Sequence, residues 1–442
     1  MTMRTAADHV QKLLMEAGFS TFKVGGFVRD TLLGREPKDV DVCTAATPDQ
    51  VAALFPDNYD FVGAHFGVSL LKFGGATIEV ATFRKDGQYD DNRRPDSVDL
   101  VTDVREDISR RDFTVCALLM DSNGEVVDYV DGRADLENKL IRCVGDPDRR
   151  FQEDALRLLR AVRFCASLDF TMEEETFAAV KRNAHLVKNV SVERVAVELE
   201  KMLTSGHADV AYDLLLDTGL ATYVMPELNA FVGCEHRSTF HPEGDVSNHV
   251  RLLLRGLKKG CSVTLALGAL LHDCAKPVVM KIGPEHNSFH GHEHVGEGMV
   301  REILTRLKFS NDVVDTVASH TKNHMKFFSA RKMKRSTLMR FLRTPNFSEL
   351  LELGRLDCGA SCKDFTDVDF VENFLQENVE ELNTPRLVNG NDLITMGYTP
   401  GPGFKVLLDA VETAQFERMI TTREEALEFA KKRAGSVLGK VK

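Results

Sequence analysis

The chain has 442 residues, of which 43% are hydrophobic and 28% charged, and its formal net charge at pH 7 is −11. This length predicts two to four domains rather than one core. No segment approaches the ~18 apolar residues of a membrane span, and the nine cysteines lack the CxxC spacing of structural zinc. We therefore expect a reduced, cytoplasmic protein without a membrane partner. The acidic balance excludes a protein that coats nucleic acid over its whole surface, but it allows a local basic track.

The first part of the chain, to about residue 145, carries the signals of strands and hairpins. A strand is expected to end at Gly25-Gly26, and a helix to begin at Pro48 with Thr47 as its N-cap. Two hairpins are expected to turn at Gly74-Gly75 and Asn123-Gly124. Beyond this part, apolar residues recur at helical spacing. The sequence therefore predicts an α+β fold, with a mixed sheet in front and helices behind.

The Gly25-Gly26 turn precedes an apolar run over 28–33 that Gly34 ends. Such a turn presents backbone N–H groups at the N-terminus of a helix, where anions bind. Arg29 can add a charge-assisted hydrogen bond to an anion held there. A tight turn without any ligand explains the same residues.

Two aspartates, Asp39 and Asp41, lie in the apolar segment KDVDV. On a strand, both carboxylates would point to one face, because strand side chains alternate. Like charges held together resist burial unless a cation lies between them, and a pair of Mg²⁺ ions shared with substrate phosphates meets that need. Taken alone, the pattern is more simply explained as a loop with solvated acids.

The turn and the DxD pattern together resemble the nucleotidyltransferase superfamily that includes DNA polymerase β. The resemblance implies that Asp39 and Asp41 bind Mg²⁺ and that Gly26 and Arg29 hold a triphosphate. A third carboxylate often completes the site of that superfamily. Glu79 is the candidate, although a structural glutamate on an edge strand is the simpler interpretation.

Four ordered motifs over roughly residues 20–170 resemble the class II tRNA nucleotidyltransferases and bacterial poly(A) polymerases. They are the opening stretch 24–45, RRDFTVCALL at 110–119, DYVDGRADLENKLIR at 128–142 and FQEDALRLLRAVRF at 151–164. The resemblance implies a head with a five-stranded sheet, followed by a neck, a body and a tail. We expect the catalytic head at 1–145, a helical neck with base-selecting and RNA-binding parts at 146–230, the helical body at 231–365 and the helical tail at 366–442.

Four residues of the last motif recur every three positions, as a stripe along one helix: Asp154, Arg157, Arg160 and Arg163. A carboxylate only accepts hydrogen bonds and a guanidinium only donates them. Asp154 with Arg157 can therefore match the edge that C and A share and leave U and G unpaired, without a nucleic-acid template. An ion pair on a solvated helix is the alternative. Arg160 and Arg163 would hold phosphate or the fold of the neck.

The second motif supplies a further contact and a departure from the family. Arg111 matches a position for triphosphate or ribose contact, whereas Arg110 matches a structural one. Cys116 stands where relatives usually have Asn, and a thiol cannot reproduce the donor and acceptor of an amide. The polar stretch 83–107 matches the family's flexible loop, which is linked with addition of the final A. Its presence favours complete CCA addition over a CC-only enzyme.

His and Asp recur in the helical half in the order H…HD…H…H…D, with the His272-Asp273 pair at the end of an apolar run. That pair is costly to bury unless it is coordinated. The pattern resembles the HD phosphohydrolase domain, with His249, His272, Asp273, His292, His320 and Asp357 as the matching residues. These ligands suit a second divalent metal: Ni, Mn, Fe or Mg. The implied activity is that of a phosphatase or 2′,3′-cyclic phosphodiesterase on damaged RNA ends, and a purely structural HD fold is the alternative.

The leading hypothesis is template-independent addition of C, C and A to the tRNA 3′ end, from CTP and ATP with Mg²⁺, releasing pyrophosphate. A poly(A) polymerase or an A-only enzyme shares the same head motifs. A third hypothesis makes the HD domain the enzyme and the head a mere RNA-binding module. The basic stretch 322–343 is either a solvated helical face or a track for the RNA backbone. The sequence implies no stable protein partner.

Overall fold

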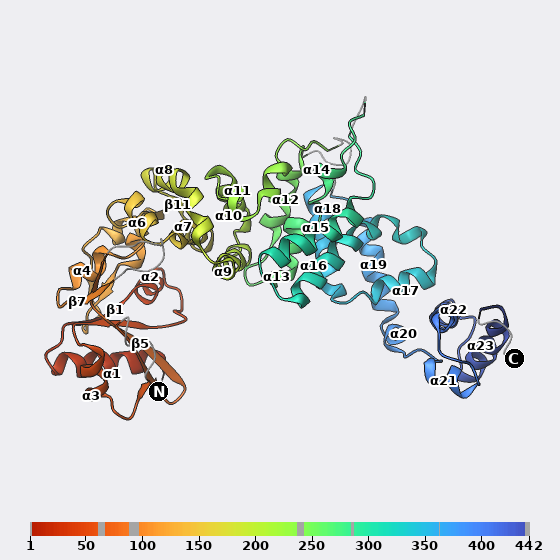
Figure 1. The fold of residues 1–442 in the computed structure, drawn as a ribbon, viewed down its shortest axis with the longest axis horizontal. Helices are drawn as coiled ribbons and strands as arrows, with labels where there is room; N and C mark the ends of the chain where they lie inside the picture. Colours follow the sequence, from red (N-terminus) through yellow and green to blue (C-terminus); the bar gives the residue numbers. More distant parts are fainter. Residues whose placement is uncertain are drawn as a thin grey trace. The chain divides into compact units, whose positions relative to one another are not determined.

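The structure is a computed structural model that describes residues 2–60, 67–87, 97–236, 243–283, 287–361 and 363–437. It divides into two compact units. The first unit comprises Met1–Gly233, Leu254–Ala266 and Ile303–Phe309, and the second comprises Cys234–Leu253, Leu267–Glu302 and Ser310–Lys442. Among the described residues, no helix combines the length and the apolar character needed to cross a membrane. A mixed sheet in the N-terminal part of the chain, followed along the sequence by helices, confirms the predicted α+β fold (Figure 1).

A seven-stranded sheet forms the centre of the head, in the order β3-β4-β5-β2-β1-β8-β9. Its strands are β1 (Thr21–Val24), β2 (Asp41–Thr44), β3 (Tyr59–Asp60), β4 (Val68–Phe73), β5 (Ala76–Thr82), β8 (Leu119–Met120) and β9 (Val126–Val127). Only β2 and β5 pair in parallel, and the other neighbours are antiparallel. The five strands that the resemblance implied were too few, because the two-residue strands β3 and β9 extend the sheet at its two edges. Both predicted hairpins, β4–β5 and β8–β9, are present.

The helices of the head are α1 (Met3–Glu16), α2 (Gly26–Leu32), α3 (Pro48–Leu54), α4 (Val104–Ser109) and α5 (Gly132–Glu137), with the 3-10 helix η2 (Thr114–Cys116). Helix α1 packs against β1, β2 and β5. Helix α3 begins as predicted, with a capping box between Thr47 and Gln50. The stretch expected to be a flexible loop includes a hairpin of β6 (Arg84–Asp86) and β7 (Val98–Leu100) and the start of α4. Residues 88–96 of that stretch lie outside the described residues.

Helices follow the head, together with one short parallel pair, β10 (Leu140–Ile141) and β11 (Thr171–Met172). They are α6 (Pro147–Glu153), α7 (Leu156–Leu168), α8 (Glu174–Asn183), η3 (Ala184–Asn189), α9 (Val192–Leu203), α10 (Ala208–Asp217), α11 (Ala221–Val224) and η4 (Pro226–Phe231). The stripe predicted along one helix is interrupted at Asp154, whose φ of −138° and ψ of 104° are extended. Asp154 therefore follows the last residue of α6, and its carboxylate accepts a hydrogen bond from the N–H of Leu156, the first residue of α7.

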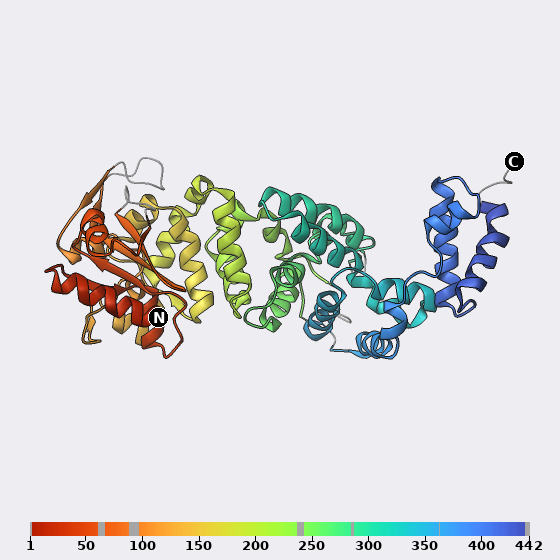
Figure 2. The same cartoon turned by 90° about the horizontal axis from the view of Figure 1, so that it is seen from below.

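The remaining elements are helical. They are α12 (Val246–Gly256), α13 (Val263–Leu271), α14 (Lys276–Val279), α15 (His292–Arg306), α16 (Asn311–Asn323), η5 (His324–Lys332), α17 (Arg335–Leu342), α18 (Phe347–Ala360), α19 (Thr366–Glu377), α20 (Val379–Asn383), α21 (Gly390–Thr395), α22 (Pro402–Phe416) and α23 (Arg423–Val437). The last three helices have a core of their own, and α22 and α23 lie side by side near the C-terminus (Figure 2). This core includes the small stripe Ala426, Ala430 and Ala434 of α23.

Candidate functional site

Three carboxylates come together on the sheet of the head. Asp41 begins β2 and lies directly opposite Glu79 of β5 in the parallel register. Burial, followed by the charges of Glu79 and Asp39, raises the pKa of Asp41 to about 6. Asp39 is exposed and lies just before the strand, so it does not alternate with Asp41 along one strand as expected.

Glu79 is the residue that sequence reasoning discounted. Strand β5 has β4 on one side and β2 on the other, so Glu79 does not lie on an edge strand. Directly opposite residues of paired strands share one face of the sheet, and the charge of Glu79 acts on Asp41. Three acids in one place repel one another unless cations lie among them, and all-oxygen donors of this kind fit Mg²⁺.

The Gly25-Gly26 turn borders this cluster of acids. Gly25 has a φ of +72°, a conformation that favours glycine. A Cβ at Gly26 would lie 3.9 Å from Asp39 Oδ1, and a Cβ at Gly25 would lie 3.7 Å from Arg111 Nη1. The turn therefore lies beside both a carboxylate and a guanidinium, the two kinds of group that can hold a metal-bound phosphate.

Arg111 and Arg29 each donate hydrogen bonds to an aspartate. Arg111 Nη2 donates to Asp107 at 3.0 Å. Burial would raise the pKa of Asp107, but the charges of Arg111 and Arg110 lower it. Arg29 donates from Nε to Asp30 at 2.8 Å and from Nη1 to Cys116 Sγ at 3.4 Å. Cys116, at the position expected to hold Asn, thus contacts a predicted phosphate-binding arginine.

The side chains of Asp154 and Arg157 form no hydrogen bond or ion pair with each other among the described residues, and only a backbone hydrogen bond of 3.0 Å joins the two. Arg157 donates to Glu153 at 2.9 Å and to two backbone carbonyls, those of Arg150 at 3.1 Å and Arg110 at 2.8 Å. These bonds leave Nε and one hydrogen of Nη2 for a ligand. The simple ion pair considered as an alternative is therefore not formed.

Arg160 and Arg163 of α7 pair with acids and share an aromatic neighbour. Arg160 Nε donates to Asp112 at 2.7 Å, and Arg163 Nε lies 2.6 Å from Glu198. The ring of Phe164 has three guanidiniums around it, with Arg163 at 4.1 Å and Arg29 and Arg160 at 5.3 Å from its centre. The helix thereby connects predicted nucleotide-binding residues of the head and the neck.

A second cluster lies in the second unit, where two groups of residues can each hold a metal ion: His249, His272 and Asp357, and Asp273, His292 and His324. The predicted ligand His320 belongs to neither group. His320 is buried in α16 against Gly268, and His324 takes the place expected for it. The two histidines are four positions apart, and α16 ends between them at Asn323.

The hydrogen bonds at Nδ1 of the four imidazoles show which ring nitrogen faces the other residues of the cluster. Each Nδ1 bonds to an atom that only accepts: Glu243 Oε1 for His249 and a backbone carbonyl oxygen for His272, His292 and His324. In neutral rings each Nδ1 therefore carries the proton and each Nε2 presents a lone pair. Glu243 was missed by sequence reasoning because its distance from His249 along the chain follows no motif.

The Nε2 nitrogens face one another in pairs. His249 Nε2 lies 3.3 Å from His272 Nε2, and His292 Nε2 lies 3.2 Å from His324 Nε2. Two ligands about 2.1 Å from one metal ion are separated by ~3.0–3.4 Å at the angles of octahedral or tetrahedral sites. Each pair thus has the spacing of two ligands on a common ion, where two lone pairs would otherwise repel.

Asp273 lies between the two pairs. Its Oδ2 is 3.3 Å from His272 Nε2, and its Oδ1 is 3.2 Å from His292 Nε2. Lys276 Nζ lies 2.6 Å from the same Oδ2. Burial would lower the pKa of His249, but hydrogen bonds to Asp357 and Glu243 and the nearby charges raise it to about 9. Without a cation the cluster therefore retains a proton.

Most of the charge in the basic stretch 322–343 is internally paired. Its arginines bond to acids: Arg331 to Asp367, Arg335 to Glu381, and Arg340 and Arg343 to Glu412. Lys322 pairs with Glu297 at 2.8 Å. Three further lysines of the stretch are exposed: Lys326, Lys332 and Lys334. Any contact of this stretch with an RNA backbone would therefore involve mainly these lysines and the exposed Arg331.

Three family profiles match the chain in order. They are the Poly A polymerase head domain over residues 21–142, the probable RNA and SrmB-binding site of polymerase A over residues 169–232, and the HD domain over residues 245–349. The predicted domain boundaries stay predictions.

The proteins similar to this chain include several CCA-adding enzymes. A CCA-adding enzyme from Lactobacillus johnsonii is 33% identical over 423 residues, which cover 96% of each chain. A CCA-adding enzyme from Bacillus pumilus is 45% identical over 216 residues, so the chain spans about half the length of that relative, 54%. The Bacillus stearothermophilus CCA-adding enzyme, solved in complex with CTP, superimposes with a TM-score of 0.75 at 27% identity, covering 99% of this chain and 98% of that one.

Proposed function

The chain belongs to the CCA-adding enzyme family, and from that premise we propose that it adds C, C and A to the 3′ end of tRNA, using CTP and ATP. The observation that carries the proposal is the gathering of Asp39, Asp41 and Glu79 beside the Gly25-Gly26 turn. Three carboxylates beside a glycine turn and two arginines form the kind of donor set that nucleotidyl transfer needs.

In each proposed addition, the tRNA 3′-oxygen attacks the α-phosphorus of the incoming nucleotide. A new P–O bond forms, the bond to the β-phosphate breaks, and pyrophosphate leaves with that electron pair. Asp39, Asp41 and Glu79 would hold Mg²⁺, which when bound would acidify the 3′-hydroxyl and neutralise the triphosphate. Arg29 and Arg111 would donate to the phosphates, and their acidic partners keep both guanidiniums in position.

We propose that Asp154, together with Arg157, selects the base in place of a nucleic-acid template. Its carboxylate would accept from the exocyclic amine of C or A, and the free Nε and Nη2 hydrogens of Arg157 would donate to the adjacent ring nitrogen. U and G present the opposite order at these positions. A mismatched base would leave buried groups unpaired, which is costly.

Incorporation by the purified protein tests this function. The assay uses tRNA lacking CCA, with each of the four labelled nucleotides offered in turn. The proposal expects CTP to be added at the bare end and ATP only after two C residues. A long tail from ATP alone would support polyadenylation, and addition only to tRNA ending in CC would support an A-only enzyme. Asp41→Asn serves as the inactive control, and no transfer by the wild type would refute the proposal.

A second candidate function is metal-dependent hydrolysis of phosphate esters at RNA ends by the HD domain. The facing Nε2 atoms of the histidine pairs favour it, because they have the spacing of metal ligands. The residues suit two neighbouring divalent ions with Asp273 between them. Metal bound there would activate water for attack on phosphorus. Lys276 would add positive charge beside the bound phosphate.

Phosphatase and cyclic phosphodiesterase assays separate this activity from that of the head. The substrates are RNA ending in a 3′-phosphate or a 2′,3′-cyclic phosphate, with Ni²⁺, Mn²⁺ or Mg²⁺ added. Asp273→Asn is expected to abolish hydrolysis and leave nucleotide addition intact, whereas Asp41→Asn should do the reverse. If Asp41→Asn changed nothing and the wild type only hydrolysed, the head would be an RNA-binding module. If the wild type, with each metal supplied, hydrolysed neither RNA, the second candidate function would be refuted.

A further inference from the structure

The carboxylate of Asp154 is held at both oxygens. Oδ1 accepts from the backbone N–H of Leu156 at 3.1 Å. Oδ2 lies 3.3 Å from Nη2 of Arg194, which donates to it. The guanidinium that contacts this carboxylate is therefore that of Arg194, whereas Arg157 is turned toward Glu153 and backbone carbonyls.

Arg194 is well placed to act as a fixed support. It lies in the first turn of α9, and Glu198 follows it by one turn on the same face. Glu198 pairs with Arg163 of α7 at 2.6 Å, and α7 and α9 pack along each other. Helix α9 therefore has contacts both at the start of α7, through Asp154, and farther along it, through Arg163. The side chain of Arg194 is 30% exposed, so a substitution leaves most of the packing of α9 in place.

We propose that Arg194 is a positioning residue for base selection, holding the carboxylate of Asp154 in one orientation. The inference rests on the proposed function. A carboxylate that is free to rotate can accept from the N3–H of uracil or the N1–H of guanine as readily as from an exocyclic amine, because all of its oxygens are acceptors. A carboxylate fixed at both oxygens offers its remaining lone pairs in one direction. Rejection of U and G then depends on Arg194 as well as on Asp154.

Misincorporation measured with tRNA lacking CCA tests the inference. Arg194→Met is expected to raise the kcat/KM for UTP and GTP, relative to that for CTP and ATP, by roughly 10- to 100-fold, as loss of a charge-assisted hydrogen bond implies. Arg194→Lys keeps the charge without the planar fork and should raise the ratio less. Arg182→Met is the matched control, because Arg182 pairs with Asp148 and Glu175 and not with Asp154.

The outcomes distinguish this inference from the proposed function. If the kcat/KM for UTP and GTP relative to CTP and ATP stayed at the wild-type value in Arg194→Met but rose in Asp154→Ala, the role of Arg194 would be overturned and that of Asp154 would stand. An equal rise in Arg182→Met would also overturn it, because the effect would then be general loosening of the helices. If Arg194→Met does not fold, the ratio of Arg194→Lys decides by the same criterion. A wild-type protein that adds no nucleotide would refute the proposed function, and this inference with it.

Discussion

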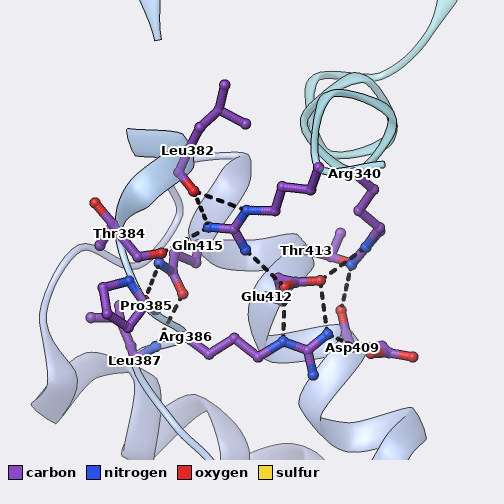
Figure 3. A network of polar contacts seen from close by, with 11 residues as sticks. Arg340, Leu382, Thr384, Pro385, Arg386, Leu387, Asp409, Glu412, Thr413 and Gln415 are labelled. Atoms are coloured by element: carbon purple, nitrogen blue, oxygen red, sulfur yellow. Dashed lines mark hydrogen bonds and ion pairs between the residues drawn. The ribbon is translucent and has the colours of Figure 1, made fainter. Parts of the chain in front are cut away.

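Replacing Glu412 with Gln is expected to loosen the attachment between α17 and the last helices of the chain. Glu412 of α22 is surrounded by three guanidiniums (Figure 3), from Arg340 at 3.1 Å, Arg343 at 3.2 Å and Arg386 at 2.8 Å. Arg343 also donates to the carbonyl oxygens of residues 382 and 384. One carboxylate therefore joins α17, α22 and the segment between α20 and α21.

The expected loss of local stability follows from how far Glu412 and its three arginine partners are buried. The side chain of Glu412 is 6% exposed, whereas those of Arg340, Arg343 and Arg386 are 38%, 28% and 41% exposed. Removing one partner of a fully buried ion pair costs about 3–5 kcal/mol. Solvent screens these partly exposed guanidiniums, so we expect a loss of about 2–3 kcal/mol in local stability. That loss raises the open population roughly 30- to 150-fold.

Limited trypsin digestion measures this opening. The bond after Arg386 lies in the segment that the cluster holds closed, and its cleavage rate follows the population of the open form. Mass spectrometry of the fragments should show cleavage after Arg386 accelerating by the same factor in Glu412→Gln. Glu428→Gln is the control, because Glu428 is exposed and pairs only with Lys432, one turn away. Equal cleavage rates in the two variants, within about twofold of the wild type, would refute the reasoning.

Three further outcomes are expected. Gly132→Ala should lower the melting temperature or prevent folding, because its Cβ would clash with the backbone carbonyl oxygen of Thr114 in η2. Overpacking of this kind costs about 3 kcal/mol. As a control, Gly75→Ala should leave the melting temperature unchanged, because its Cβ would meet no atom within 4 Å. The affinity of the head for Mn²⁺, measured by electron paramagnetic resonance, should fall as the pH is lowered through about 6, because Asp41 takes up a proton near that pH and no longer binds a cation. Equal affinities at pH 5 and pH 7.5 would contradict this. His324→Asn should remove metal from the HD domain, as measured by mass spectrometry of bound metal, whereas His320→Asn should retain it.

Features that depend on neighbouring residues could be predicted from the sequence. The start of α3 needs only Thr47, Pro48 and Gln50, and the two hairpins need only their turns and flanking apolar runs. The placement of Asp39 and Asp41 beside the glycine turn was implied by the resemblance to the nucleotidyltransferase superfamily, whose motif lies within about fifteen residues here. In each case the interaction that forms the feature is local, so the pattern contains it.

Features that depend on register or on a helix end could not be predicted. The facing of Glu79 is fixed by the pairing of β5 with β2, about forty residues earlier. The choice between His320 and His324 depends on the end of α16 at Asn323, beyond which helical spacing no longer applies. Likewise, the stripe that begins at Asp154 assumed one continuous helix, whereas the backbone is extended at that residue, between α6 and α7.

The basic stretch 322–343 shows why a run of charge does not measure the charge available to a ligand. Its arginines are paired with acids that lie 36 to 72 residues later in the chain, from Asp367 for Arg331 to Glu412 for Arg340. A planar guanidinium that forms two or more bonds within the protein has little left for phosphate, whereas an exposed ammonium keeps its donors. Any RNA contact here would therefore depend on Lys326, Lys332, Lys334 and the exposed Arg331, whereas substituting Arg340 or Arg343 would test the attachment of the C-terminal helices instead.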